Sequence, residues 1–309
     1  MHYESNVDVH NGSASCVSSA VQCRHWWESV EGTFMIQNIY RSLQRFFALD
    51  STSKLVRSPA FRGDSRSVAL KKAMNNRVSI HFRPNYLYAR IPKAANSTVT
   101  FVLADCLRRS GRLSDEESDV SPKKLYRAYR LSEMSRREIA QIGSTHFKFA
   151  FVRNPYRRAL SAYLDKIARP FPRIQELRDQ PYEHARRLMV TEALNCDFYE
   201  PVSFEQFVGY LERGGINDDP HWCRQIDLIP HHLFELDFIG KVETLQRDLL
   251  TVVEQLFGMD YDNISQVRRG PKTAADNVIG EYYSKELQDR VFGLYARDFA
   301  VFGYDSEHS

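Results

Sequence analysis

The feature that most constrains the fold is a pattern that occurs three times: a short apolar run, a turn, and then a segment with helical spacing. The copies cover residues 86–111, 146–167 and 237–258. The apolar runs predict strands, and apolar residues at i, i+3, i+4 and i+7 predict helices. Strands that alternate with helices are typical of a parallel sheet covered by helices. We therefore expect an α/β fold with a central parallel sheet.

Capping signals mark three further helices. Ser135 with Glu138, and Ser203 with Gln206, form the capping-box pattern, and Gly143 is expected to end the first of these helices. Ser284 is expected to cap the last helix of the chain.

An insertion from about residue 170 to 235 separates the second and third units. Ligands of open α/β sheets bind outside the carboxyl ends of the strands, so this insertion is expected to build the site of a second substrate.

The N-terminal part has a different composition. Residues 1–32 are polar and predict partial disorder. Apolar residues of the next segment share one helical face: Met35, Ile39, Leu43, Phe46 and Phe47. This helix either docks on the domain or contacts a membrane surface or a partner. We expect an extension over residues 1–75 and one domain over residues 76–309.

Composition restricts the class of protein. A chain of 309 residues can bury a sizeable core, and its net charge of +3 is too low to indicate a nucleic-acid binder. The five cysteines are odd in number and scattered, which indicates a reducing compartment rather than a disulfide framework. No signal peptide or membrane span is apparent. The expected location is cytoplasmic, with peripheral membrane association as an alternative.

The turn of the first unit carries a lysine. In "RIPKAANST", Lys93 follows the strand and hydroxyl residues open the helix. The free N–H groups and positive end of a helix attract an anion, and a lysine adds a point charge. The stretch from Arg90 to Thr98 contains no glycine, so the usual P-loop pattern is absent. Alone, this turn fits either an anion site or an ordinary turn.

The second turn favours the anion site. Arg153 stands at the end of the second strand and Ser161 lies eight residues later, within the helix. Two anion-binding turns on one sheet indicate a ligand with two separated phosphates, because a triphosphate does not need both.

Several ordered motifs then resemble one family. "RIPKAANST", "FVRNPYRRALSAYLDK", "DPHW", "DFIGKVETL" and the closing "YYSKELQDRVFGLYARDFAVFGYD" are similar to the carbohydrate sulfotransferases that include chondroitin 4-sulfating and HNK-1-type enzymes. The resemblance covers about residues 76–304. It implies a fold like that of nucleoside kinases, with a P-loop-like turn. It also implies transfer of the sulfuryl group of 3′-phosphoadenosine 5′-phosphosulfate (PAPS) to a carbohydrate hydroxyl, with release of PAP and no metal requirement.

The resemblance assigns the donor-binding residues. The 5′-phosphosulfate would be held by Lys93, Ala94, Ala95, Asn96, Ser97 and Thr98. The 3′-phosphate would be held by Arg153 and Ser161. Asn154 departs from the family's common aspartate, and we expect the change to be tolerated because this position forms a turn.

The implied in-line transfer needs a base and a stabilised leaving group. Lys93 is the candidate to neutralise charge on the bridging oxygen. His221 of "DPHW" is the first candidate for the base, and His146 is the second. Trp222 is a candidate to stack on an acceptor sugar. The alternatives are a structural histidine and a core tryptophan.

Three features leave their roles open. Glu243 matches a family motif, but a carboxylate near a helix start also explains it. The basic stretch Arg268–Lys272 either closes over the nucleotide or is a solvated loop. A zinc cluster can be drawn from four residues, but their spacing matches no common ligand set: His221, Cys223, His231 and His232.

The absence of an apparent anchor favours a soluble, bacterial-type member that acts on cytoplasmic glycans or glycolipid precursors. One alternative is an ATP-dependent, kinase-like phosphotransferase, against which the missing P-loop glycines argue. Another is a PAP-binding protein without turnover. Acceptor identity and oligomeric state are not indicated by the sequence.

Overall fold

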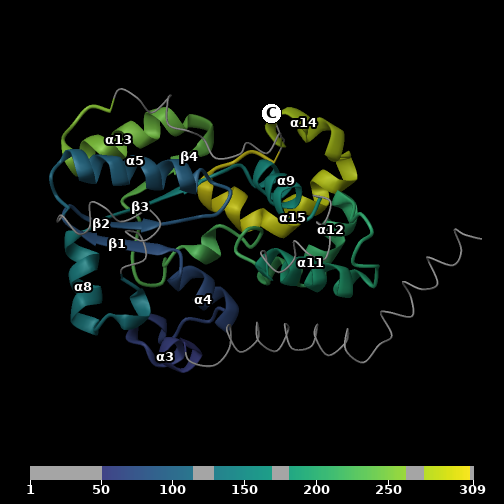
Figure 1. Cartoon of the computed structure of the whole chain (residues 1–309), viewed down its shortest axis with the longest axis horizontal. Coiled ribbons are helices and arrows are strands. Elements are labelled where there is room, and N and C mark those ends of the chain that lie inside the picture. Colours follow the sequence, from purple (N-terminus) through teal and green to yellow (C-terminus); the bar gives the residue numbers. More distant parts are fainter. Residues whose placement is uncertain (1–50, 114–128, 169–180, 262–274, 307–309) are drawn as a thin grey trace, which may run out of the picture. The chain divides into compact units, whose positions relative to one another are not determined.

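The computed structural model describes residues 51–113, 129–168, 181–261 and 275–306. Within these residues, four strands form one sheet in the order β1 (Val78–Phe82), β2 (Asn85–Ala89), β3 (Phe147–Val152) and β4 (Phe238–Lys241), as Figure 1 shows. β2, β3 and β4 are parallel. The α/β prediction is therefore confirmed, with one difference: β1 pairs antiparallel with β2 at the edge of the sheet.

The helices begin and end as follows: α3 (Ser51–Arg57), α4 (Val68–Asn75), α5 (Asn96–Arg109), α8 (Arg136–Thr145), α9 (Pro155–Lys166), α11 (Pro181–Leu194), α12 (Phe204–Glu212), α13 (Leu245–Phe257), α14 (Ala275–Tyr282) and α15 (Lys285–Phe302). Short 3₁₀ turns connect them: η1 (Pro59–Phe61), η2 (Leu131–Glu133), η3 (Gly215–Asn217), η4 (Ile226–Leu228) and η5 (Val242–Thr244).

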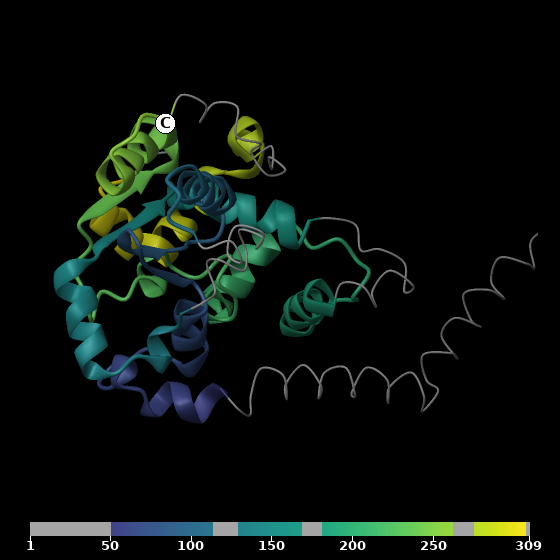
Figure 2. The ribbon, with the colours of Figure 1, turned by 60° about the vertical axis from the view of Figure 1, so that its left-hand side comes forward.

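The two faces of the sheet have different partners because side chains alternate along a strand. Tyr86, Tyr88, Phe149 and Phe151 point to one face and pack on apolar residues of α5 and α13. Both views of the ribbon show these two helices together on that face (Figures 1 and 2). On the other face, Leu87 packs with residues of α3, α4 and α8.

The predicted helix starts are confirmed. Ser135 and Ser203 each form a complete capping box, and Ser284 caps α15 by accepting the N–H of Leu287. The prediction that Gly143 ends α8 is wrong. The helix continues through Thr145 and ends where His146 adopts an extended backbone.

The compact unit that contains the sheet runs from Thr52 to Ser309. Leu55, Phe61 and Met74 share a core cluster with Val78, so residues 52–75 pack with the domain, whereas the sequence placed the boundary near residue 75. The N-terminal helix expected around residues 35–47 and the stretch Arg268–Lys272 lie outside the described residues. In the part of the chain that the structure describes, no helix has both the length and the apolar character needed to cross a membrane.

Candidate functional site

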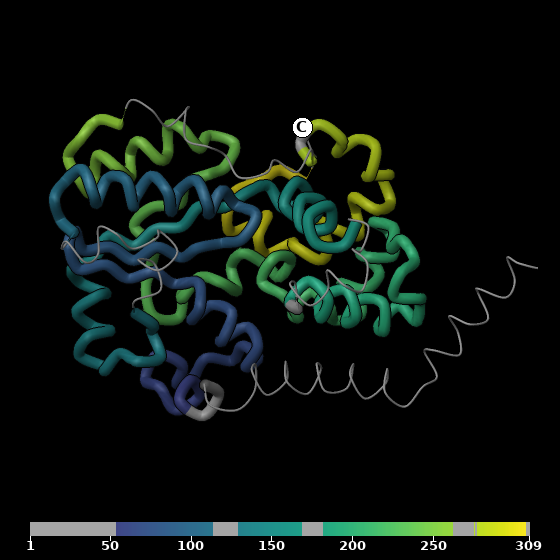
Figure 3. The backbone as a smooth tube through the Cα atoms, in the orientation of Figure 1, coloured from purple at the N-terminus to yellow at the C-terminus, as the bar shows by residue number. Residues whose placement is uncertain are grey.

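The turns that follow β2 and β3 lie at the same edge of the sheet, because the two strands are parallel neighbours. Figure 3 shows the path of the chain from each strand into its helix. The two turns also touch: Nη1 of Arg153 donates to the carbonyl oxygen of Lys93 over 3.4 Å. The structure thus brings together the two cationic residues that the sequence singled out.

The first turn adopts a left-handed backbone without glycine. Lys93 has φ 66° and Ala95 has φ 53°, a region that costs an ordinary residue about 1–2 kcal/mol. Ala95 directly precedes α5, and no side chain caps the start of that helix. The helix therefore presents backbone N–H groups that lack a side-chain acceptor, and these suit an anion.

Lys93 has a counter-ion on α9. Its Nζ lies 3.3 Å from Oδ2 of Asp165, and the lysine side chain is 15% exposed. Burial lowers the pKa of Lys93, and Asp165 opposes that effect. The amine is thus held in a largely desolvated position beside the first turn.

Asn154 shapes the second turn. Its side chain accepts the N–H groups of Tyr156 and Arg157 and so caps α9, which confirms the turn-forming interpretation. Glu243 of η5 supports the same turn. Its Oε1 accepts the N–H of Asn154 over 2.8 Å, and its Oε2 accepts the hydroxyl of Tyr304 over 2.9 Å.

The backbone of Arg153 is fixed by Gln225. The amide side chain of Gln225 accepts the Arg153 N–H over 2.9 Å and donates to the Arg153 carbonyl over 2.8 Å. Asp298 of α15 in turn accepts the N–H groups of Gln225 and Ile226. Ser161 lies in the second turn of α9 and is only 1% exposed.

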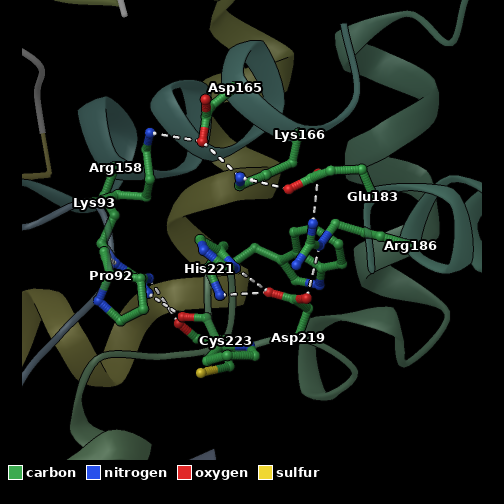
Figure 4. Close-up of polar contacts among 12 residues, drawn as sticks. Pro92, Lys93, Arg158, Asp165, Lys166, Glu183, Arg186, Asp219, His221 and Cys223 are labelled. Carbon is green, nitrogen blue, oxygen red and sulfur yellow. Dashed lines mark hydrogen bonds and ion pairs between the residues drawn. The ribbon is translucent and has the colours of Figure 1, made fainter. Parts of the chain in front are cut away.

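Arg158 joins the first turn to the segment that carries His221. It is 1% exposed, and its guanidinium donates to three carbonyl oxygens: Pro92 over 3.0 Å, Pro220 over 3.0 Å and Cys223 over 2.7 Å. Figure 4 labels Arg158, Pro92 and Cys223 beside the His221 pair. Residues more than 60 positions apart are thereby held at one place.

His221 forms a pair with Asp219. Oδ1 of Asp219 lies 2.6 Å from Nδ1 of His221 and 2.7 Å from its backbone nitrogen. Burial lowers the pKa of His221, while Asp219 acts to raise it. A neutral imidazole that donates from Nδ1 to a carboxylate keeps Nε2 as an acceptor. This arrangement suits a general base.

The structure contradicts an acceptor contact for Trp222. The indole has no exposed surface, donates to the Gly215 carbonyl over 2.8 Å and packs against Phe207 and Tyr210. A sugar ring has no free face of this side chain on which to stack.

His146 is also misplaced for the role of second candidate base. It precedes β3, at the opposite end of the strand from Arg153. A six-residue strand spans roughly 20 Å, so His146 lies far from the two turns. The residue is 3% exposed, and its ring contacts Phe82 edge to face.

The other residues of the possible zinc cluster have their own contacts. Nδ1 of His232 lies 2.6 Å from the Arg66 guanidinium, its Nε2 lies 2.8 Å from the Ala60 carbonyl, and Nδ1 of His231 lies 3.1 Å from the Ile229 carbonyl. Among the described residues, no group of three or more side chains is arranged to hold a metal ion.

Comparison with known proteins decides the family. A family model described as "Sulfotransferase family" matches residues 77–305, which include both turns and the His221 segment. The chain belongs to the sulfotransferase family. The resemblance found in the motifs is thereby confirmed.

Curated relatives of this sulfotransferase are distant. Carbohydrate sulfotransferase 8 of Mus musculus is 25% identical over 264 residues, which cover 81% of this chain and 61% of the relative. Carbohydrate sulfotransferase 14 of Danio rerio is 28% identical over 256 residues, which cover 78% of this chain and 65% of the relative. Carbohydrate sulfotransferase 10 of Xenopus laevis is 23% identical over 279 residues, which cover 82% of this chain and 75% of the relative. The matches thus span less than two thirds of the length of the first two relatives, and no solved structure matches the chain.

Sequence reasoning missed the residues that position the site. Asp219 stands inside the "DPHW" motif, so its pairing with His221 had a local signal. Arg158, Gln225 and Asp165 had none, because each acts on a residue far away in the sequence.

Proposed function

We propose that this sulfotransferase moves the sulfuryl group of PAPS to a hydroxyl of a carbohydrate and releases PAP. The observation that supports it best is the contact between two basic turns at one edge of the sheet, one of them at a helix start without a side-chain cap. The carbohydrate acceptor rests on the names of the relatives, all of which are carbohydrate sulfotransferases.

The first turn suits the 5′-phosphosulfate of the donor. Lys93 supplies a charge, and residues 94–98 supply the start of α5. Arg153 is the proposed ligand of the 3′-phosphate. The proposed contact with Ser161 requires neighbouring side chains to move, because Ser161 is buried.

The proposed residues account for the proton, the bonds and the charge of the transfer reaction. Nε2 of His221 takes the proton of the acceptor hydroxyl as its oxygen forms a bond to sulfur. The bond between sulfur and the bridging oxygen breaks, and its electron pair stays on the 5′-phosphate of PAP. Lys93 and the start of α5 stabilise that negative charge. PAP and the sulfated carbohydrate leave.

Calorimetry with PAP, ADP and ATP, each without metal, tests the donor. PAP is expected to bind at least about tenfold more tightly than ADP, because only PAP offers a phosphate to each turn, and one well-placed charged contact contributes about 1.5–3 kcal/mol. Equal affinity for PAP and ADP would remove the two-phosphate argument. Tighter binding of ATP would favour the kinase-like alternative.

Two variants test the chemistry with a panel of carbohydrate acceptors. Lys93→Ala is expected to reduce transfer strongly, and Lys285→Ala, an exposed lysine paired with Asp289, is its control. His221→Ala is expected to keep PAP affinity and lose about 100-fold or more in transfer. The exposed His231 gives the matched control, His231→Ala. Transfer by His221→Ala at the wild-type rate would exclude His221 as the base.

A further inference from the structure

A continuous chain of ion pairs, which ends in the hydrogen bond between Asp219 and His221, links the two candidate catalytic residues (Figure 4). The successive contacts are Lys93–Asp165 at 3.3 Å, Asp165–Lys166 at 3.1 Å, Lys166–Glu183 at 2.9 Å, Glu183–Arg186 at 2.6 Å, Arg186–Asp219 at 2.8 Å and Asp219–His221 at 2.6 Å. We call this set the ion-pair chain.

The ion-pair chain differs from ordinary surface ion pairs in three ways. Its members come from four places in the sequence: the first turn, α9, α11 and the segment that follows η3. Their charges alternate in sign, so each charge is flanked by opposite ones. Their side chains are between 10% and 32% exposed, so solvent screens them less than it screens exposed pairs.

Arg186 occupies the position next to the histidine pair. It is the least exposed member, at 10%. Its Nε binds Oδ2 of Asp219 and its Nη1 binds Oε2 of Glu183, so one guanidinium bridges two carboxylates. Because Arg186 binds Oδ2 of Asp219, the other carboxylate oxygen, Oδ1, is left to bind His221. It contacts both the backbone nitrogen and Nδ1 of His221.

We propose that Arg186 is a positioning residue for sulfuryl transfer, which holds Asp219 against His221 and connects that pair, through Glu183, Lys166 and Asp165, to Lys93. The proposal deepens the proposed function, because it rests on His221 as the base. It also gives the insertion helix α11 a role in assembling the reaction centre.

The charge of Arg186 has a predictable effect on His221. The charged groups of the described residues with the largest effects on this imidazole are Asp219, which favours its protonation, and Arg186 of α11 and Arg77, which precedes β1, both of which oppose it. Asp219 still accepts the backbone N–H of His221 when Arg186 is removed, so the main effect is the loss of a nearby positive charge, and the pKa of His221 rises. More of the base is then protonated, and inactive, at pH 6.

The test compares Arg186→Met with wild type in two assays. The first follows the His221 ring signals by NMR as pH changes, without donor or acceptor. The second measures the pH profile of kcat/KM. In Arg186→Met the ring titrates at higher pH, and the ratio of kcat/KM at pH 8 to that at pH 6 rises by about fivefold or more. Arg186→Lys retains the charge and is expected to restore most of the pH profile.

Arg290→Met is the matched control, because Arg290 also pairs with two glutamates, Glu205 and Glu212, but on the surface of α12 and α15. If Arg186→Met and Arg290→Met both show the wild-type His221 titration and pH profile, the proposal is overturned. If Arg186→Met does not fold, Glu183→Gln is the deciding variant. It removes one of the two carboxylates that Arg186 binds and turns Arg186 wholly toward Asp219, so His221 should titrate at lower pH. A titration of His221 at unchanged or higher pH overturns the proposal.

Failure of the proposed function gives a different result. If PAP does not bind the wild-type protein, the donor assignment fails, while the NMR titration still reports whether Arg186 sets the state of His221.

Discussion

Replacement of Arg158 by methionine gives the most quantitative test of how the site is held together. The guanidinium is buried and donates three hydrogen bonds, and each accepting carbonyl belongs to a segment near the site. Methionine fills most of the volume but leaves these three oxygens without that donor. Hydrogen bonds to charged groups contribute about 1.5–3 kcal/mol each, and the cost of burying the arginine offsets part of their sum.

We expect Arg158→Met to lower the free energy of unfolding by about 4 kcal/mol, because each buried carbonyl left without its donor costs about 1–3 kcal/mol and the relieved burial of the arginine charge offsets part of that sum. Urea denaturation followed by circular dichroism, with linear extrapolation, measures this change. The melting temperature should fall by roughly 10 °C, since about 1 kcal/mol shifts a domain of this size by about 2–4 °C.

The controls distinguish the loss of the three hydrogen bonds of the Arg158 guanidinium, which we call the buried fork, from the loss of its charge alone. Arg158→Lys keeps the charge but lacks the planar fork, so it should recover only part of the stability. Arg290→Met removes exposed ion pairs and should cost about 1 kcal/mol or less. A loss below about 1 kcal/mol for Arg158→Met would refute the reasoning, because the three carbonyls would then be satisfied without the guanidinium.

Three further predictions concern packing, capping and pH. Gly240→Ala places a Cβ against the buried ring of Phe151, closer than van der Waals contact, so it should cost about 1–3 kcal/mol in thermal or urea unfolding, and a neutral result would show that the strands can separate locally. Asn154→Ala should lose about 1 kcal/mol of the α9 cap by the same assay, whereas Asn154→Asp should stay near wild type. Burial lowers the pKa of His221 and His146, so the unfolded chain binds more protons near their ordinary titration range. The free energy of unfolding should therefore fall as pH decreases from 7.5 to 5.5, and a rise would contradict this sign.

Local signals predicted the parts of the fold whose causes are local. The apolar run that opens the unit at residues 146–167 forms a strand at 147–152, and the capping boxes at Ser135 and Ser203 have the predicted contacts, because each depends on neighbours in the sequence. The edge strand β1 had no such signal. Its segment, Val78–Phe82, contains Ser79 and His81, and its pairing with β2 extends the sheet in the antiparallel sense.

The residues of the candidate site also divide into those with a local signal in the sequence and those without one. Lys93 and Arg153 could be identified because each directly follows a strand, and parallel neighbours bring such positions together. Trp222 could not be assigned from the motif, because "DPHW" does not show which of its two rings faces the core. The structure buries the indole and leaves the imidazole of His221 18% exposed.

No local pattern in the sequence points to Arg158. The first two turns of α9 bury small and apolar side chains on nearly all sides, including Ala159, Leu160 and Ala162. Arg157 stands in the same two turns and is only half-buried, so these neighbours do not decide which arginine is enclosed, and a buried arginine needs acceptors. The burial of Arg158 could not be predicted, because its acceptors come from segments more than 60 residues away and have no local signature.

Arg158 and Arg186 hold the same region by different physical means, and this difference separates stability from chemistry. Arg158 binds neutral carbonyls, so it fixes where the first turn and the His221 segment lie, and its loss should lower both the free energy of unfolding and PAP affinity. Arg186 binds two carboxylates, so it sets the charge around the Asp219–His221 pair. Its loss should change the pH profile of transfer more than PAP affinity. Opposite outcomes for the two arginines would indicate that the ion-pair chain, rather than the buried fork, determines the architecture of the site.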